Sequence, residues 1–170
     1  MLYPQFKGVP LEAYNRMVDL LKARARQELK LSDSELVVRP LRPEDIGFAN
    51  PVFNSTVAAS GTLAWSNLVN TYTIADNRFV GVNGVFADKT RDNLTQIKVT
   101  RSGKTTRLWS VQQVRDFEDK IAYADDPFTV GQNEQITIER YATTKVGDSM
   151  FGFVGVVIEK RGLTINPSSY

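Results

Sequence analysis

Short β-favouring segments, broken by turn residues every eight to twelve positions, make up most of the chain beyond Gly47. The segments are rich in Thr, Val, Tyr, Phe and Ile, and this spacing is typical of a β-sandwich or barrel rather than of βαβ units. A shorter strand, cut by Pro40, is expected within residues 35–41. The other predicted strands are Val52–Val57, Leu68–Ile74, Phe79–Phe86, Leu94–Arg101, Thr105–Trp109, Phe128–Val130, Gln135–Ala142 and Met150–Glu159.

Two of these segments differ from the rest because they are apolar without interruption. Ile136 and Ile138 alternate with polar neighbours, which predicts a strand with one buried face. The segments at Phe79–Val82 and Phe153–Val156 share the tetrapeptide FVGV and show no such alternation. Strands of this kind are usually covered on both faces, so both are predicted to lie centrally in a sheet.

The N-terminal part is predicted to be an arm followed by an amphipathic helix. Residues 1–10 contain two prolines and a glycine and are expected to be extended, and Pro10 suits the first turn of a helix. Apolar residues then recur at steps of three and four, which places them on one helix face. They are Leu11, Tyr14, Val18, Leu21, Ala25 and Leu29. We therefore predict an arm and helix over residues 1–33 and a β domain over residues 34–170. A second, short helix is expected from Val111 to Phe117, capped by Ser110.

Histidine and cysteine are both absent from the 170 residues. Their absence excludes Ser-His-Asp and Cys-His catalysis, disulfides and zinc–thiolate sites. We expect a protein without enzymatic activity, cofactor or bound metal. An acidic group at Asp116, Glu118, Asp119, Asp125 and Asp126 leaves two alternatives open, a calcium site and a solvated helix end with its turn.

No apolar run approaches the roughly 20 residues needed to span a bilayer, so no membrane span is expected. The first five residues lack the basic and apolar regions of a signal peptide, so synthesis in the cytoplasm is expected.

Basic residues on the predicted helix are candidates for contact with a partner. They are Arg16, Lys22, Arg24, Arg26 and Lys30. They could contact packaged nucleic acid or an acidic surface of a neighbouring protein. The alternative is a solvated helix that packs on its own domain.

Aromatic residues in or beside the predicted strands offer a second kind of site. If Trp65, Tyr72 and Tyr123 were exposed in one row, their rings could stack on sugar rings. The alternative is that such rings pack in the core, which is what we expect of Trp109.

The order of several short segments resembles that of small virion proteins of prokaryotic viruses, both bacteriophages and archaeal viruses. The segments are Asp76–Phe86, Leu94–Val99, Leu108–Ser110, Ile136–Ala142 and Phe153–Gly162. The resemblance implies a jelly-roll-like antiparallel β-sandwich that forms a capsid shell or decorates it as a cement protein. It also implies homo-oligomers, trimers or larger, other capsid proteins as partners, and a place in the virion after synthesis in the host cytoplasm. The alternative function is a carbohydrate- or receptor-binding β-sandwich.

Overall fold

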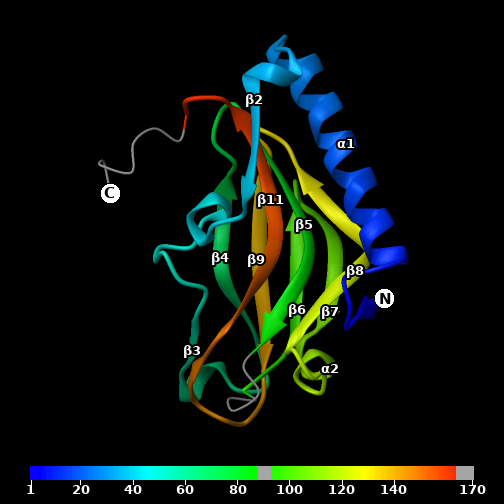
Figure 1. The fold of residues 1–170 in the computed structure, drawn as a ribbon. Helices are drawn as coiled ribbons and strands as arrows, with labels where there is room; N and C mark the ends of the chain where they lie inside the picture. Colours follow the sequence, from blue (N-terminus) through cyan, green and yellow to red (C-terminus); the bar gives the residue numbers. More distant parts are fainter. Residues whose placement is uncertain (88–92, 164–170) are drawn as a thin grey trace.

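The computed structural model describes residues 1–87 and 93–163, so residues 88–92 and 164–170 of the predicted β domain lie outside the described part. The fold is mainly β, as predicted, with two larger antiparallel sheets and a long N-terminal helix (Figure 1). The helical elements are α1 (Val9–Leu29), η1 (Asp33–Glu35), η2 (Pro43–Ile46), η3 (Ala59–Gly61) and α2 (Val111–Arg115). The strands are β1 (Leu2–Tyr3), β2 (Leu36–Pro40), β3 (Ser55–Val57), β4 (Trp65–Thr73), β5 (Arg78–Ala87), β6 (Leu94–Arg101), β7 (Lys104–Ser110), β8 (Ile121–Val130), β9 (Gln135–Ala142), β10 (Gly147–Ser149) and β11 (Phe151–Lys160).

The two larger sheets form a sandwich around the main core. One sheet has five strands in the order β1-β8-β5-β11-β2, and the other has four in the order β4-β9-β6-β7. Strands β3 and β10 form a separate pair. The core between the sheets contains Ile136 and Ile138, which the alternation in β9 placed inward. Trp109 also lies there, at 7% exposure, and this confirms the core position expected of it.

The two FVGV segments are central, as predicted, and they pair with each other. Antiparallel β5 and β11 are neighbours in the middle of the five-stranded sheet, and Val157 of β11 lies opposite Val80 of β5. Their inner face packs in the sandwich core, and part of their outer face packs under α1 with Phe79 and Ile158. Burial on both faces explains why these segments carry no alternation.

Helix α1 begins at Val9, two residues before the predicted start, and packs on the five-stranded sheet of its own chain. The predicted stripe is rotated: Leu21 and Ala25 are buried, but Leu11 is 38% exposed. Ala13 and Met17 take the buried positions instead. Gly81 allows this approach, since a Cβ there would lie 2.7 Å from Met17 Sδ.

Strand β8 is much longer than the predicted Phe128–Val130 segment, because Asp125, Asp126 and Pro127 interrupt the apolar pattern that begins in its first half. Asp125 lies beside the short strand β1 and forms an ion pair with the N-terminal ammonium at 2.6 Å.

The bounds of three other elements differ from the prediction by two or three residues. Strand β4 begins three residues before its predicted start, β3 begins three residues after its predicted start, and α2 ends at Arg115, two residues before its predicted end. Ser102 and Gly103 connect β6 to β7, with φ of 48° and 79°, as a tight two-residue hairpin requires.

Within residues 1–87 and 93–163, no helix is both long enough and apolar enough to cross a lipid bilayer.

Candidate interaction face

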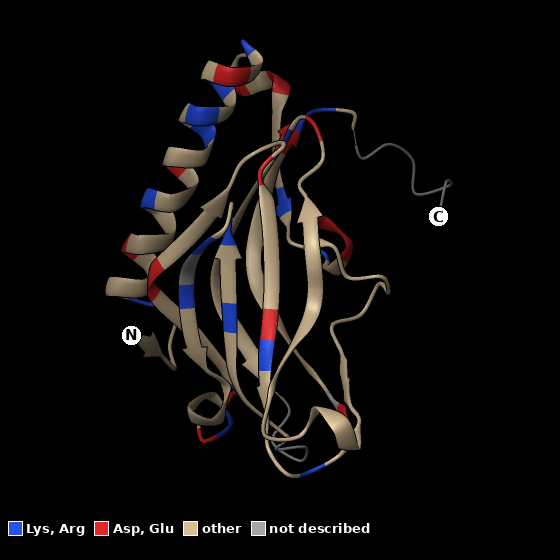
Figure 2. Cartoon of the chain, turned by 180° about the vertical axis from the view of Figure 1, so that it is seen from behind, with Lys and Arg blue, Asp and Glu red and all other residues tan. Residues whose placement is uncertain are grey.

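The outer face of the four-stranded sheet carries side chains from all four strands in two adjacent rows. Figure 2 looks onto this sheet. Cross-strand pairing aligns Asn67, Glu139, Lys98 and Leu108 in one row, and Trp65, Tyr141 and Gln96 in the next. We call these seven residues the Trp65 face.

The middle of the Trp65 face is an aromatic ring, a cation and a carboxylate from three strands. Lys98 Nζ lies 4.6 Å from the centroid of the Trp65 ring and 2.7 Å from Glu139 Oε2. The Trp65 and Tyr141 rings meet edge to face, with centroids 5.5 Å apart, and the Tyr141 hydroxyl donates to the Leu63 carbonyl at 3.1 Å. These contacts fix the orientation of side chains that also face solvent.

Large apolar side chains on this face remain accessible. Trp65 is 38% exposed and Leu108 is 55% exposed. Asn67 and Gln96 are exposed beside them. Glu139 is neutralised by Lys98, so the face offers apolar area, amides and a paired charge. Such a mixture suits contact with another surface, because it buries apolar area without stranding a charge.

Local sequence explains the outward position of these residues. Side chains alternate along β9, so the even-numbered residues Ile136 and Ile138 are buried. The odd-numbered residues Thr137, Glu139 and Tyr141 therefore face outward. In β7 the buried Trp109 turns its neighbour Leu108 to the outer face.

The predicted row of Trp65, Tyr72 and Tyr123 is not formed. Tyr72 packs against the sandwich core, and a Cβ at Gly47 would lie 2.5 Å from the Tyr72 side chain. Tyr123 belongs to β8 in the other sheet, where its ring lies 4.9 Å from that of Phe6. Of these three residues, only Trp65 lies on the outer face of the four-stranded sheet. The sequence pattern does not indicate to which sheet each strand belongs.

The predicted basic residues of α1 are spread along the helix among acidic ones (Figure 2). Arg24 and Arg26 bind carboxylates of their own chain. Arg24 contacts Glu28 at 2.5 Å and Glu134 at 3.1 Å, and Arg26 Nη1 lies 2.8 Å from both oxygens of Asp33. Lys22 is half-buried, and Lys30 is an exposed C-cap residue with a left-handed φ of 56°.

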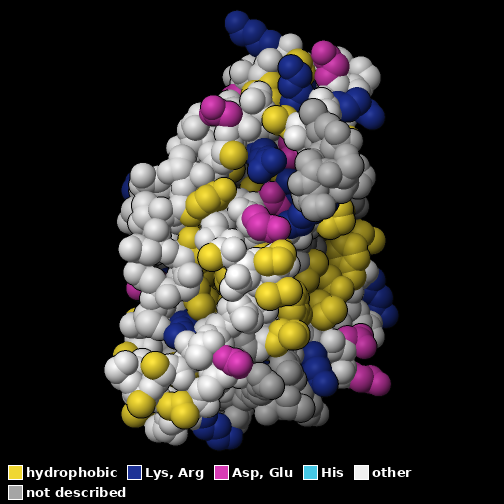
Figure 3. Space-filling model, turned by 90° about the vertical axis from the view of Figure 1, so that its left-hand side faces the viewer, with side chains coloured by type: hydrophobic (Ala, Val, Ile, Leu, Met, Phe, Trp, Pro, Cys, Tyr) yellow, Lys and Arg dark blue, Asp and Glu magenta, His cyan; other side chains and the backbone are white. Residues whose placement is uncertain are grey.

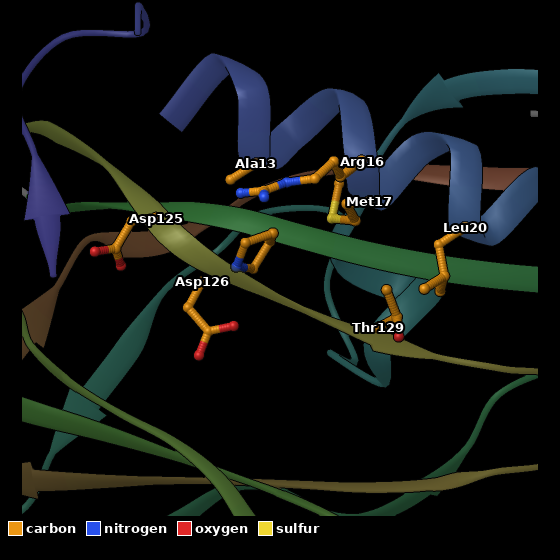
Figure 4. Close-up of a pocket in the computed structure, with 8 residues that line it drawn as sticks. Ala13, Arg16, Met17, Leu20, Asp125, Asp126 and Thr129 are labelled. Atoms are coloured by element: carbon orange, nitrogen blue, oxygen red, sulfur yellow. The ribbon is translucent and has the colours of Figure 1, made fainter. Parts of the chain in front are cut away.

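Arg16 is exposed and lines a shallow pocket of about 260 Å³ between α1 and β8, together with Asp125 and Asp126 (Figure 4). Both carboxylates point away from the helix in this view. Asp126 pairs with Arg107 at 2.6 Å, and Asp125 pairs with the N-terminus. Among the described residues no group of three or more acidic side chains is placed to hold a metal ion.

Sequence reasoning missed Lys98, Glu139, Leu108 and Asn67 as members of a shared face. The alternation in β9 could have indicated that Glu139 points outward, but only strand pairing brings it to Lys98.

Comparisons with known proteins give only remote structural likenesses. No protein-family model matches the chain, and no curated protein sequence matches it significantly. The ANX2 ectodomain from Arabidopsis thaliana is similar over 76% of this chain, with 11% identity and a TM-score of 0.39, and the match spans 41% of that ectodomain chain. The CBM36-1 domain of a multidomain xylanase, from the hindgut metagenome of Trinervitermes trinervoides, is similar over 75% of this chain and 100% of its own, with 14% identity and a TM-score of 0.27.

Proposed function

We propose that this protein is a structural subunit that acts through protein–protein interfaces, and that its setting is a virion, as part of the capsid shell or as a decoration subunit on it. The Trp65 face is the observation that carries the proposal. It combines an accessible tryptophan, a tyrosine and an exposed leucine with a charge pair that is already neutralised. Tryptophan and tyrosine are enriched in the residues that dominate binding energy at protein interfaces.

Exposed sheet edges favour assembly as well. Strand β7 ends the four-stranded sheet, and β2 ends the five-stranded sheet. An unpaired strand edge is a template for another chain, and a closed homo-oligomer can cover it. The virion setting rests on the sequence resemblance, which implies copies of this chain and other capsid proteins as partners.

The first experiment measures association of the purified protein and its binding to virions that lack it. Native mass is determined by sedimentation, and bound protein is counted on the particles by electron microscopy. Leu108→Glu should abolish association, because it places an unpaired charge in the interface. Val146→Glu is the matched control, since Val146 is 60% exposed but lies in the loop before β10. Equal association of the wild type and both variants, in solution and on particles, would exclude the Trp65 face as the interface.

A second candidate function is carbohydrate binding, which the exposure of Trp65 favours. An accessible indole can stack on a sugar ring, and the nearby Asn67 and Gln96 amides can bind hydroxyls. A glycan array tests this alternative with the wild type and Trp65→Ala. Binding that the substitution removes would support it, and a silent array would eliminate it.

A further inference from the structure

A groove lies on the opposite side of the molecule, on the outer face of the five-stranded sheet, beside the N-terminal end of α1. Its volume is about 410 Å³. Tyr14 of α1, Phe6 of the arm and Tyr123 of β8 provide aromatic walls, and Val154 and Val156 of β11 add aliphatic surface. In Figure 3, whose right-hand side is the front of Figure 1, hydrophobic side chains gather towards the right.

The aromatic walls are held in place by one another. The Phe6 and Tyr14 rings meet edge to face with centroids 5.3 Å apart, and the Phe6 and Tyr123 centroids are 4.9 Å apart. Phe6 is nonetheless 39% exposed. A fourth ring could therefore extend this cluster with the offset or edge-to-face geometry that aromatic groups favour.

Asn83 is the unusual residue of the groove. It lines the groove from β5 and is only 2% exposed. Among all described residues, none forms a hydrogen bond with Asn83 Oδ1. Buried side-chain acceptors are almost always paired, so an unmet one beside a cavity needs a physical reason.

The backbone shows that Asn83 occupies a bulge. On β11, Val154 lies opposite Gly84 and Gly155 opposite Val82, so the described register skips Asn83. The register with β8 shifts at the same point, between Val82 and Gly84. A bulge adds one residue to a strand and redirects its side chain, and bulges are frequent beside functional sites. In this protein the redirected side chain is the amide that lines the groove.

We propose that this groove binds a flat aromatic ring carrying one hydrogen-bond donor, of the indole or phenol type, whose N–H or O–H donates to Asn83 Oδ1 once the amide rotates to bring this buried oxygen to the groove. The ring packs among Phe6, Tyr14 and Tyr123. The volume lies in the lower part of the range of about 300–1,000 Å³ that is usual for small-ligand sites. The ring belongs to a free small molecule, because the groove has the volume of a small-ligand site. This site is separate from the Trp65 face, so either proposal can fail without the other.

The test is a titration of ¹⁵N-labelled protein with indole and with 1-methylindole, followed by NMR. The two probes have the same bicyclic ring, but 1-methylindole lacks the N–H donor. Indole should cause saturable shifts at Gly155, Tyr123 and the Asn83 side-chain amide. 1-Methylindole should bind at least about fivefold more weakly, since a buried acceptor then stays unmet.

Two variants separate the role of Asn83 from general surface effects. Asn83→Leu should bind both probes equally, whereas Asn70→Leu, a substitution of an exposed asparagine on β4, should retain the wild-type preference. The comparison of probes on the wild type needs no variant, so it holds even if Asn83→Leu fails to fold. Equal binding of the two probes to the wild type, shifts confined to another surface, or no saturable shift up to the solubility limit would each overturn the proposal.

A third probe, N-acetyltryptophanamide, tests the other possible source of the ring, a tryptophan side chain of a partner. It should bind more weakly than indole, and binding at least as tight as that of indole would overturn the assignment to a free small molecule.

Discussion

The Lys98 ammonium lies 4.6 Å from the centroid of the Trp65 ring, so the most accessible aromatic of the four-stranded sheet is held by a cation from a strand two positions away. A cation over an indole at an exposed site contributes about 0.5–1 kcal/mol. Trp65→Leu and Lys98→Met should therefore show a coupling of that size in a double-mutant cycle measured by urea unfolding.

A second cycle controls for the loss of the Lys98–Glu139 ion pair, which affects Lys98→Met in both cycles. It combines Lys98→Met with Trp109→Phe, because Trp109 lies on the inner face of the sheet. This coupling should be close to zero. Similar couplings in the two cycles would contradict a specific contact between Lys98 and Trp65.

The buried ion-pair network around Arg39 predicts a larger effect on stability. Arg39 binds Glu159 at 3.0 Å and Asp45 at 2.7 Å, and these two carboxylates are 0% and 4% exposed. Burial alone would lower the pKa of the Arg39 guanidinium, but its bonds to Asp45 and Glu159 hold it above its ordinary value. Arg39→Met should lower the free energy of unfolding by about 3–5 kcal/mol, because both buried carboxylates lose this partner.

The control for Arg39 is an exposed pair of the same residue types. Arg26 and Asp33 are 45% and 63% exposed, so Arg26→Met should cost about 1 kcal/mol or less. Urea unfolding measures both variants. Equal losses would show that the Arg39 network is not the stabilising feature that its burial indicates.

Residue periodicity was sufficient to predict the central strands but not the surfaces between elements. The FVGV segments of β5 and β11 were recognisable because burial on both faces removes alternation. Helix α1 was recognisable too, but its buried face depends on Gly81 and Met17, which meet only after the helix packs on β5. Local patterns cannot predict such a contact between distant segments.

The candidate sites were harder to predict for the same reason. Trp65 was recognised as an aromatic residue beside a strand, but its contact with Lys98 depends on the pairing of β4, β9 and β6. Asn83 is polar within an apolar strand, which is a visible anomaly. Its role as the bulged residue of β5 depends on register with both neighbouring strands, and one sequence does not contain that register.

Two glycines in the five-stranded sheet should differ in their tolerance of a methyl group. At Gly81 a Cβ would meet the flexible ends of Met17 and Leu21, and at Gly155 it would meet the main-chain oxygen of Gly81. Gly81→Ala should therefore cost less than about 1 kcal/mol and Gly155→Ala about 1–3 kcal/mol, because side-chain ends rotate away more easily than a paired strand moves.

Thermal and urea unfolding of the two variants test this order. Gly61→Ala is the control, since a Cβ there would meet no atom within 4 Å, and it should be neutral or slightly stabilising. A larger loss at Gly81 than at Gly155 would contradict the packing described for β5 and β11.

The ion pair between α1 and the loop before β9 predicts a pH dependence of stability. Burial alone would raise the pKa of the Glu134 carboxyl, but the Gly131 N–H at 2.7 Å and the Arg24 guanidinium at 3.1 Å hold it below its ordinary value. A carboxyl with a lowered pKa in the folded state adds stability that is fully present above its unfolded pKa of about 4.3 and is lost as the pH falls through the folded value.

The wild type should therefore exceed Glu134→Gln in free energy of unfolding by a constant amount at neutral pH, and this difference should shrink on acidification. Urea unfolding across this range measures the difference, and Arg24→Met should reduce its pH dependence because one of the stabilising partners is gone. A difference that stays constant or grows with acidity would show that the Glu134 carboxyl is not stabilised in the folded protein.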